Sequence, residues 1–167
     1  MSNKRLYILR HGNAEQHNFS NDPARRLTPK GIEEVQRIAA QFCRQQEGLQ
    51  QVYVSPYRRA QETADYFLTT LSALGQQEVD RRETLDIITP SGDPMDVAVW
   101  LSQQQADSIL LVTHQPFATQ LVDLLADEPL PPDFMMRTGS MAALEGELFA
   151  TACCHFRWIQ HAGVGND

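Results

Sequence analysis

Residues 6–15, LYILRHGNAE, pass from four apolar residues directly to Arg10, His11 and Gly12. The apolar run predicts a buried strand over residues 5–9. If the strand continued, the side chains of Arg10 and His11 would point to opposite faces of a sheet. We therefore expect the chain to turn at Gly12, so that both side chains face one anion.

The size and composition are those of one soluble globular domain that spans residues 1–167. The chain is 42% hydrophobic and 21% charged, which is ordinary for this class. No apolar run is long enough to cross a bilayer, and the first residues do not resemble a secretory signal. The three cysteines cannot all pair within one chain. These features predict a cytoplasmic protein without a membrane partner.

The charge argues for a local anion site in an otherwise acidic protein. The formal net charge of −7 disfavours a general nucleic-acid binder or a binder of anionic membranes. All 14 basic residues except Lys4 and Lys30 are arginines. The planar guanidinium group binds the paired oxygens of a phosphate or carboxylate.

Strand-like and helix-like segments alternate along the chain. Thr28-Pro29, Ser55-Pro56, Asp93-Pro94 and His114-Gln115-Pro116 each resemble a helix start. Further strands are expected at 52–55 and 108–113, and residues 140–148 and 151–160 could form a closing antiparallel pair. This order predicts a three-layer α/β domain, with a mostly parallel central sheet and helices on both faces.

Three of the expected strands are followed by residues that suit phosphate. The first strand leads to Arg10 and His11, the second to Arg58 and Arg59 near a helix start, and the third to His114. The carboxyl ends of parallel strands lie at one edge of a sheet, where α/β proteins bind ligands. Each part also has a structural explanation, because arginines often lie on an exposed helix face and a histidine can cap a helix. The combination of all three is what favours an anion site.

These residues resemble motifs of the histidine phosphatase superfamily. The matching elements are RHG after the first strand, S-P-x-x-R-A-x-x-T-A over residues 55–64, and Thr113-His114 at the end of a later strand. The resemblance implies that His11 is the catalytic nucleophile. It also implies that Arg10, Arg59 and His114 are catalytic residues that bind the phosphoryl group. Arg59 rather than Arg58 occupies the motif position before Ala60.

The chemistry of these side chains agrees with that assignment. A neutral imidazole can attack phosphorus and form a phosphohistidine that water then hydrolyses. Neighbouring cations would lower the pKa of His11 and keep it neutral, whereas His114 is expected to be protonated when phosphate is bound. The arginines supply the positive charge, so we expect neither a metal nor another cofactor.

Two further stretches resemble the SixA-type branch, whose members dephosphorylate phosphohistidine. Residues 24–31, ARRLTPKG, resemble its R-x-L-T-x-x-G motif, which implies that Arg25, or less readily Arg26, lines the mouth of the site. Solvated arginines before a helix are the alternative. Residues 85–93 resemble a loop of the same branch. The role of Arg137, in a segment that borders the site in that branch, is left open.

The expected function is the removal of phosphoryl groups from phosphohistidine on signalling or phosphotransfer proteins, by a monomeric enzyme. Only 54 residues separate Arg59 from His114, and they contain no clear glutamate motif for a proton donor. Asp86 and Asp93 are the nearest candidates. Phosphohistidine suits such a site, because its imidazole leaving group can take a proton from solvent. The alternatives are a phosphomonoesterase for a small metabolite and a non-catalytic module that binds phosphoproteins.

Two other groups of residues could be mistaken for sites. Cys153, Cys154, His155 and His161 fit no closed zinc pattern, and residues 151–160 are expected to form a strand. His17 follows the RHG motif, where a surface loop is the simpler interpretation.

Overall fold

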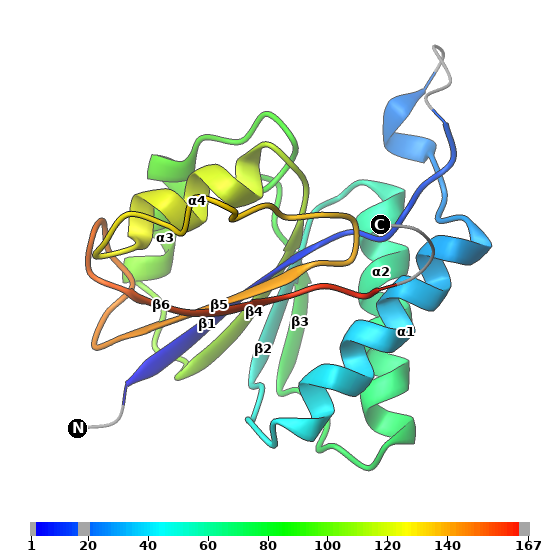
Figure 1. Cartoon of the computed structure of the whole chain (residues 1–167), viewed down its shortest axis with the longest axis horizontal. Coiled ribbons are helices and arrows are strands. Elements are labelled where there is room, and N and C mark those ends of the chain that lie inside the picture. The colour runs from blue at the N-terminus through cyan, green and yellow to red at the C-terminus, as the bar shows by residue number, and fades with distance from the viewer. Residues whose placement is uncertain (1–2, 17–20, 164–167) are drawn as a thin grey trace.

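A six-stranded sheet forms the centre of the computed structural model, which describes residues 3–16 and 21–163 (Figure 1). The strand order is β3-β2-β4-β1-β5-β6. The first four strands are parallel, β5 is antiparallel to β1, and β6 is antiparallel to β5. The strands are β1 (Lys4–Arg10), β2 (Gln51–Val54), β3 (Arg81–Thr84), β4 (Ser108–Thr113), β5 (Met141–Gly146) and β6 (His155–Gln160). The expected parallel sheet with an antiparallel closing pair is confirmed.

Helices cover both faces of this sheet and give the domain its three layers. In Figure 1, α1 and α2 lie together on one side of the sheet, and α3 and α4 lie on the other. A short 3-10 helix, η1, precedes α1. The helices are η1 (Asp22–Ala24), α1 (Pro29–Arg44), α2 (Arg58–Ala73), α3 (Pro94–Ser102) and α4 (Phe117–Leu125).

The central strand β1 is buried on both faces. Leu6 and Ile8 pack in the core under α3 and α4, whereas Tyr7 and Leu9 pack in the core under α1 and α2. This alternation follows from the two-residue period of a strand. An apolar run without polar interruption is therefore what a central strand of a covered parallel sheet requires.

Two helices begin where the sequence predicts. The side chain of Thr28 accepts a hydrogen bond from the N–H of Gly31 at 3.1 Å, and Pro29 is the first residue of α1. The side chain of Asp93 likewise accepts from the N–H of Met95 at 2.9 Å. Both caps satisfy N–H groups that have no partner within the helix.

The other two helices begin later than the sequence suggests. Ser55 accepts from the N–H of Tyr57 at 3.3 Å within a turn, and α2 starts at Arg58. His114 likewise precedes a turn, which contains a cis Gln115–Pro116 peptide bond, and α4 starts at Phe117. Arg59 therefore lies at a helix N-terminus, but His114 does not.

The last strand also begins later than the sequence suggests. Residues 151–154 form a turn and an isolated bridge between Cys154 and Ala126, and β6 starts at His155. The prediction of a strand from residue 151 is therefore wrong at its beginning.

The strands β1, β4 and β2 end at the same level. Arg10 is paired with Thr113, while Val54 is paired with Val112. The N–H of His11 then donates to the carbonyl of Thr113 at 3.0 Å, and the N–H of Ser55 donates to that of Val112 at 3.0 Å. This register places the residues that follow the three strands at one edge of the sheet.

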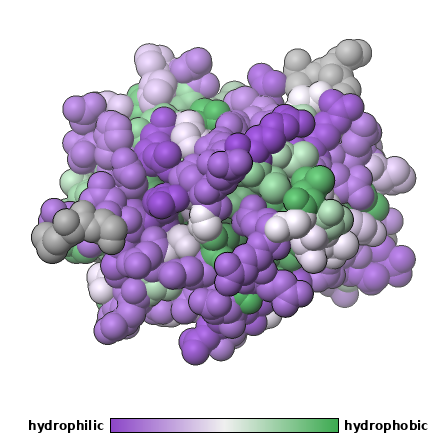
Figure 2. Space-filling model, turned by 90° about the horizontal axis from the view of Figure 1, so that it is seen from below, coloured by the Kyte–Doolittle hydropathy of each residue, from purple (hydrophilic) through white to green (hydrophobic). Residues whose placement is uncertain are grey.

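The surface seen in Figure 2 is mainly hydrophilic, with smaller hydrophobic patches between the polar residues. Among the described residues, no helix has both the length and the apolar character needed to cross a membrane.

Candidate active site

Four side chains meet at the carboxyl ends of β1, β2 and β4. Arg10 and His11 follow from β1, Arg59 lies in the first turn of α2, and His114 comes directly after β4. The Nε of Arg59 lies 3.3 Å from the Nε2 of His11. The rings of His11 and His114 are 5.1 Å apart between centroids. The structure thus brings together all four residues that the sequence selects.

Two hydrogen bonds define the tautomer of His11. Its Nδ1 lies 2.7 Å from the carbonyl oxygen of Gly12, which can only accept, so Nδ1 carries the proton. On the other side of the ring, Nε2 accepts from the Nε–H of Arg59. Nε2 therefore presents a lone pair, which is the form of imidazole that can act as a nucleophile.

Burial keeps His11 neutral. The residue is 7% exposed, and burial is the main cause that lowers the pKa of its imidazole to about 3. The hydrogen bond to Gly12 opposes this shift, whereas the charges of Arg59, Arg10 and Arg25 add to it. The expectation of a neutral His11 agrees with these surroundings, although burial contributes more than the cations.

Ser55 orients His114. The Nε2 of His114 lies 2.7 Å from the Oγ of Ser55, and both residues are buried. Ser55 accepts from the N–H of Tyr57, and in the described part of the chain its hydroxyl proton has only His114 as an acceptor. This assigns the proton of the neutral His114 ring to Nδ1, which is buried and has no hydrogen-bond partner among the described residues.

The environment of His114 also favours the neutral form. Burial, followed by the neighbouring His11 and Arg59, lowers the pKa of His114 to about 2. The sequence suggests a protonated His114 when phosphate is bound. In this structure a neutral Nδ1–H already provides a donor, so no added proton is needed for the ring to bind an oxygen.

The backbone of Arg10 and His11 is held by the loop before β5. The N–H of Gly139 donates to the carbonyls of Arg10 and His11 at 3.1 and 3.0 Å. The Nη1 of Arg10 donates to the carbonyl of Met136 at 3.0 Å. Arg137 belongs to this loop, but its side chain is exposed, and its backbone N–H donates to Ser140.

A buried carboxylate balances the charge of Arg10. Glu34 of α1 is 2% exposed and accepts from the N–H of Asn13 at 2.7 Å and from the hydroxyl of Thr138 at 3.0 Å. Burial lowers the pKa of Arg10, and the charge of Glu34 raises it. Because a guanidinium loses its proton only far above neutral pH, Arg10 remains a cation.

Gly12 allows the chain after β1 to lie against the start of α1. A Cβ atom at Gly12 would lie 2.6 Å from the carbonyl oxygen of Gly31, and a Cβ at Gly31 would lie 2.0 Å from that of Asn13. The N–H of Gly12 donates to Thr63 of α2 at 3.1 Å. The glycine of the RHG motif is therefore required by close backbone contact, as expected.

Arg59 and Arg25 share a carboxylate, that of Asp22 in η1. The Nη1 of Arg59 donates to the carbonyl of Asp22 at 3.0 Å, and its Nη2 lies 3.4 Å from Oδ2. Arg25 donates from Nε to Oδ1 of Asp22 at 2.7 Å and from Nη1 to the carbonyl of Glu15 at 2.7 Å. Its charge lowers the pKa of both His11 and Arg59, which places Arg25 at the margin of the cluster.

Arg58 and Arg26, which are adjacent in sequence to Arg59 and Arg25, lie outside the cluster. Arg58 pairs with Glu62 on the outside of α2 at 3.2 Å and is 46% exposed in its side chain. Arg26 is exposed, and its backbone N–H donates to Glu15 at 2.9 Å. The structure thus places Arg59 in the cluster and Arg25 at its margin, and Arg58 and Arg26 outside it.

The two proton-donor candidates do not join the cluster. Asp93 caps α3, and Asp86 is exposed in the loop after β3. Among the described residues, neither forms a hydrogen bond or ion pair with His11, Arg10, Arg59 or His114. His17 lies outside the described residues.

The side chains of Cys153, Cys154, His155 and His161 have different surroundings and do not form one group. Cys153 is exposed and Cys154 is buried. His155 faces Asp127 at 3.9 Å, and the Nδ1 of His161 lies 2.6 Å from the Oγ of Ser140. Within residues 3–16 and 21–163, no three His, Cys, Asp or Glu side chains are grouped so that they could hold a metal ion.

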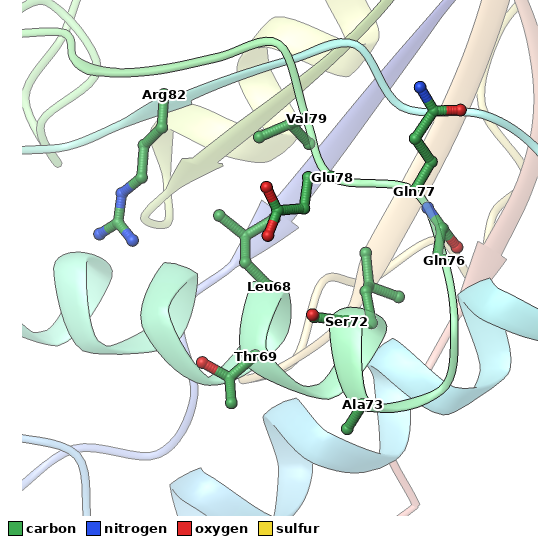
Figure 3. A pocket seen from close by; sticks show the side chains of 10 residues that line it. Leu68, Thr69, Ser72, Ala73, Gln76, Gln77, Glu78, Val79 and Arg82 are labelled. Atoms are coloured by element: carbon green, nitrogen blue, oxygen red, sulfur yellow. The ribbon is translucent and has the colours of Figure 1, made fainter.

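A groove of about 610 Å³ lies at the other end of α2 (Figure 3). It is lined by the last turns of this helix and by the chain that leads into β3, including Gln76, Glu78 and Arg82. Residues 68–73 follow Arg59 by roughly 15–20 Å along the helix axis. Its lining contains one cation, Arg82, and no histidine, and it is separate from the cluster of His11, Arg59 and His114.

The two buried histidines predict a loss of stability in mild acid. Their pKa values are about 3 and about 2 in the folded protein, against about 6.5 in the unfolded chain. Between these values the unfolded state binds more protons, so the free energy of unfolding falls as the pH falls. Urea denaturation at pH 7 and pH 5 should show a loss of about 1–2 kcal/mol for each histidine.

The variant His114→Asn should lose about half of this pH dependence, while the exposed His155→Asn should keep all of it. Equal pH dependence in H114N and the wild-type protein would show that His114 is not held neutral.

Comparison with known proteins identifies the family. Residues 6–86 match the model of the histidine phosphatase superfamily, branch 1. The chain is 30% identical over 142 residues to the phosphohistidine phosphatase SixA of Escherichia coli, covering 83% of each protein. The chain belongs to the histidine phosphatase superfamily, in its SixA-type branch.

Other members of this superfamily match over most of their length. The SixA homolog of Haemophilus influenzae is 29% identical over 150 residues, which cover 84% of this chain and 88% of that protein. The structure of the protein histidine phosphatase SixA complexed with tungstate superposes with a TM-score of 0.80 and 26% identity. That match covers 95% of this chain and 97% of the other. The family resemblance carried by the RHG, S-P-x-x-R-A and T-H motifs is confirmed.

Sequence reasoning missed three residues that complete the histidine phosphatase cluster. Ser55 was recognised within its motif only as a helix cap, and Glu34 is one of two adjacent acidic residues on α1. Asp22 stands in a polar segment without a distinctive pattern. The only local sign of a role for Asp22 is its position three residues before Arg25, at the start of the Asp-Pro turn η1, because this spacing allows the two side chains to pair.

Proposed function

We propose that this protein is a phosphohistidine phosphatase that acts through a phosphorylated His11. The observation that carries the proposal is the unprotonated Nε2 of His11, which lies 3.3 Å from the Nε of Arg59. This lone pair would form a bond to phosphorus while the bond from phosphorus to the substrate nitrogen breaks. The departing imidazole keeps that electron pair and takes a proton from solvent. Water then attacks phospho-His11 and releases phosphate.

Buried polar atoms in the cluster suit the oxygens of the phosphoryl group. The Nε of Arg10 and the Nδ1 of His114 are buried without a hydrogen-bond partner among the described residues. A phosphoryl oxygen would satisfy both, and leaving either atom unpaired costs free energy. Arg59 would add donors next to the nucleophile, and Arg25 would act from the margin. Together these groups would stabilise the charge of the transition state.

The carboxylates that could act as a general acid are engaged elsewhere, which supports a substrate with a nitrogen leaving group. Asp22 pairs with two arginines, and Asp93 accepts a hydrogen bond as the cap of α3, outside the cluster. An alkoxide leaving group benefits from a general acid by about 10²–10⁴-fold. An imidazole leaving group gains less from one, because it can be protonated by solvent.

The proposal extends to the substrate class, the oligomeric state, the cofactor requirement and the location of the enzyme. The substrate is a protein that carries phosphohistidine, and the enzyme works as a monomer without a metal or other cofactor. The three cysteines are free, which suits the reducing cytoplasm.

The function can be tested by comparing substrates side by side. A radiolabelled, histidine-phosphorylated phosphotransfer domain should be hydrolysed with a kcat/KM at least about 100-fold above that for glucose 6-phosphate, since the one carboxylate described at the cluster margin, Asp22, is engaged by two arginines and would not assist the ester. A rapid quench in alkali should trap the label on His11, because phosphohistidine is stable in base.

Faster turnover of the sugar phosphate would instead favour the metabolite phosphomonoesterase. Binding of the phosphorylated domain without release of phosphate would favour the non-catalytic module.

A further inference from the structure

The carboxylate of Asp22 occupies donor groups of two arginines at the site. Asp22 accepts from three nitrogen atoms of two arginines: Arg59 Nη1 through its carbonyl at 3.0 Å, Arg59 Nη2 through Oδ2 at 3.4 Å, and Arg25 Nε through Oδ1 at 2.7 Å. The side chain of Arg59 is 4% exposed and that of Asp22 is 31% exposed. The anionic partner is thus the more accessible of the two.

Asp22 contacts the Nη1–Nη2 end of the Arg59 guanidinium group, next to the edge that faces His11. The Nε–H of Arg59 points to His11 Nε2 at 3.3 Å, and Nη2 belongs to the same edge as Nε. This pair of parallel N–H groups is the one that binds two oxygens of a carboxylate or a phosphate together. A phosphoryl group in position for attack by His11 would therefore approach Nη2, the guanidinium nitrogen that the carboxylate of Asp22 already contacts.

The segment that carries Asp22 is more exposed than the helix turn that carries Arg59. None of the three residues of η1 is buried, and the N-cap of η1 makes no side-chain hydrogen bond. In Figure 1, η1 lies outside the packed layers of the domain. By contrast, Arg59 is fixed by α2, and Thr63 accepts from Gly12 and donates to the carbonyl of Arg59.

We propose that Asp22 is a built-in competitor of the phosphoryl group for Arg59 and Arg25, and that it weakens the binding of free phosphate. This inference rests on the proposed function, because it concerns the affinity of that same site. A phosphoryl group must replace the carboxylate on Arg59 or bind beside its negative charge. Either case lowers the affinity for a phosphate anion, since like charges repel and charge-assisted hydrogen bonds are exchanged rather than gained.

The competition would distinguish a protein-bound phosphohistidine from its product. Free phosphate is held by the phosphoryl contacts alone, and so it bears the full cost of displacing Asp22. A phosphoprotein also contacts the surface around the site and loses a smaller part of its binding free energy. Asp22 would thereby favour product release and limit inhibition by cellular phosphate.

The variant Asp22→Asn tests this inference. It keeps the size of the side chain but removes its charge. Glu33→Gln, on the exposed face of α1, is the matched control for the change in net charge. Titration calorimetry with inorganic phosphate, and separately with tungstate, should give a Kd about tenfold lower for D22N than for the wild-type protein and E33Q. The inhibition constant of phosphate in phosphohistidine turnover should fall by a similar factor, and the KM for the phosphoprotein should fall less.

An unchanged or higher Kd in D22N would overturn the inference and show that Asp22 orients the arginines instead. If phosphate binds neither protein, the inference fails together with the site assignment. If phosphate binds more tightly to D22N but neither protein hydrolyses phosphohistidine, the competition stands and only the proposed function fails. Thermal melting of both variants checks that each one is folded.

Discussion

Replacing His11 by asparagine should reduce phosphohistidine turnover by about 10⁴-fold or more, because the reaction loses its nucleophile. Asparagine is the informative choice, since its side-chain amide can still donate to the carbonyl of Gly12 as Nδ1 of His11 does. The variant should therefore fold and still bind inorganic phosphate. Single-turnover assays with a radiolabelled phosphoprotein measure both the rate and the label retained on the enzyme.

The control for this experiment is His155→Asn, which removes an exposed histidine from the start of β6. It should retain full activity and trap label as the wild-type protein does. If H11N still forms a phosphoenzyme at the wild-type rate, another residue is the nucleophile and the proposed mechanism is wrong.

Replacing Arg59 by lysine should lower kcat by about 10²–10³-fold, although the charge is kept. Lysine has no planar pair of parallel donors, so it cannot hold His11 Nε2 and a phosphoryl oxygen in the fixed geometry that the guanidinium edge provides. The substitution also removes the stacking of the guanidinium on Tyr57, whose ring centroid lies 4.9 Å away. The loss should appear mainly in kcat, because the interaction with developing charge is strongest in the transition state.

Arg58→Lys is a matched control, because it makes the same exchange one residue earlier in the same helix turn. Arg58 faces solvent and pairs with Glu62, so this variant should remain within about twofold of the wild-type activity. Equal losses in R58K and R59K would contradict the assignment of Arg59 and would indicate an effect on α2 as a whole.

Local chemistry explains why much of the fold could be predicted from the sequence. Residues 6–9 of β1 are all apolar because both faces of the strand are covered there, and Thr28 and Asp93 cap their helices with their own side chains. Such features depend on residues within one turn of each other. The motif order then placed His11, Arg59 and His114 at strand ends, and the parallel sheet brought these ends together.

Contacts between distant segments explain most of what could not be predicted. Ser55-Pro56 has the form of a helix start, but the hydroxyl of Ser55 is bonded to a ring 59 residues away, and α2 begins at Arg58. Asp22 and Arg59 are 37 residues apart, and Glu34 and Thr138 are 104 apart. No local pattern encodes such pairs, because each depends on how the helices pack on the sheet.

The carboxyl ends of β1, β2 and β4 lie in register at one edge of the sheet, and this has a consequence for the evolution of such enzymes. Loops that follow these strands can lengthen or shorten without altering the register that joins Arg10 to Thr113 and Val54 to Val112. Residues 85–92 follow the neighbouring parallel strand β3, which ends opposite Val54, and so they form a further connection at this edge. Residues added there would contact the substrate around the site, while the positions of the phosphoryl-binding groups would not change. One scaffold can therefore acquire new substrates by changing its connections and leave the chemistry of bond cleavage intact.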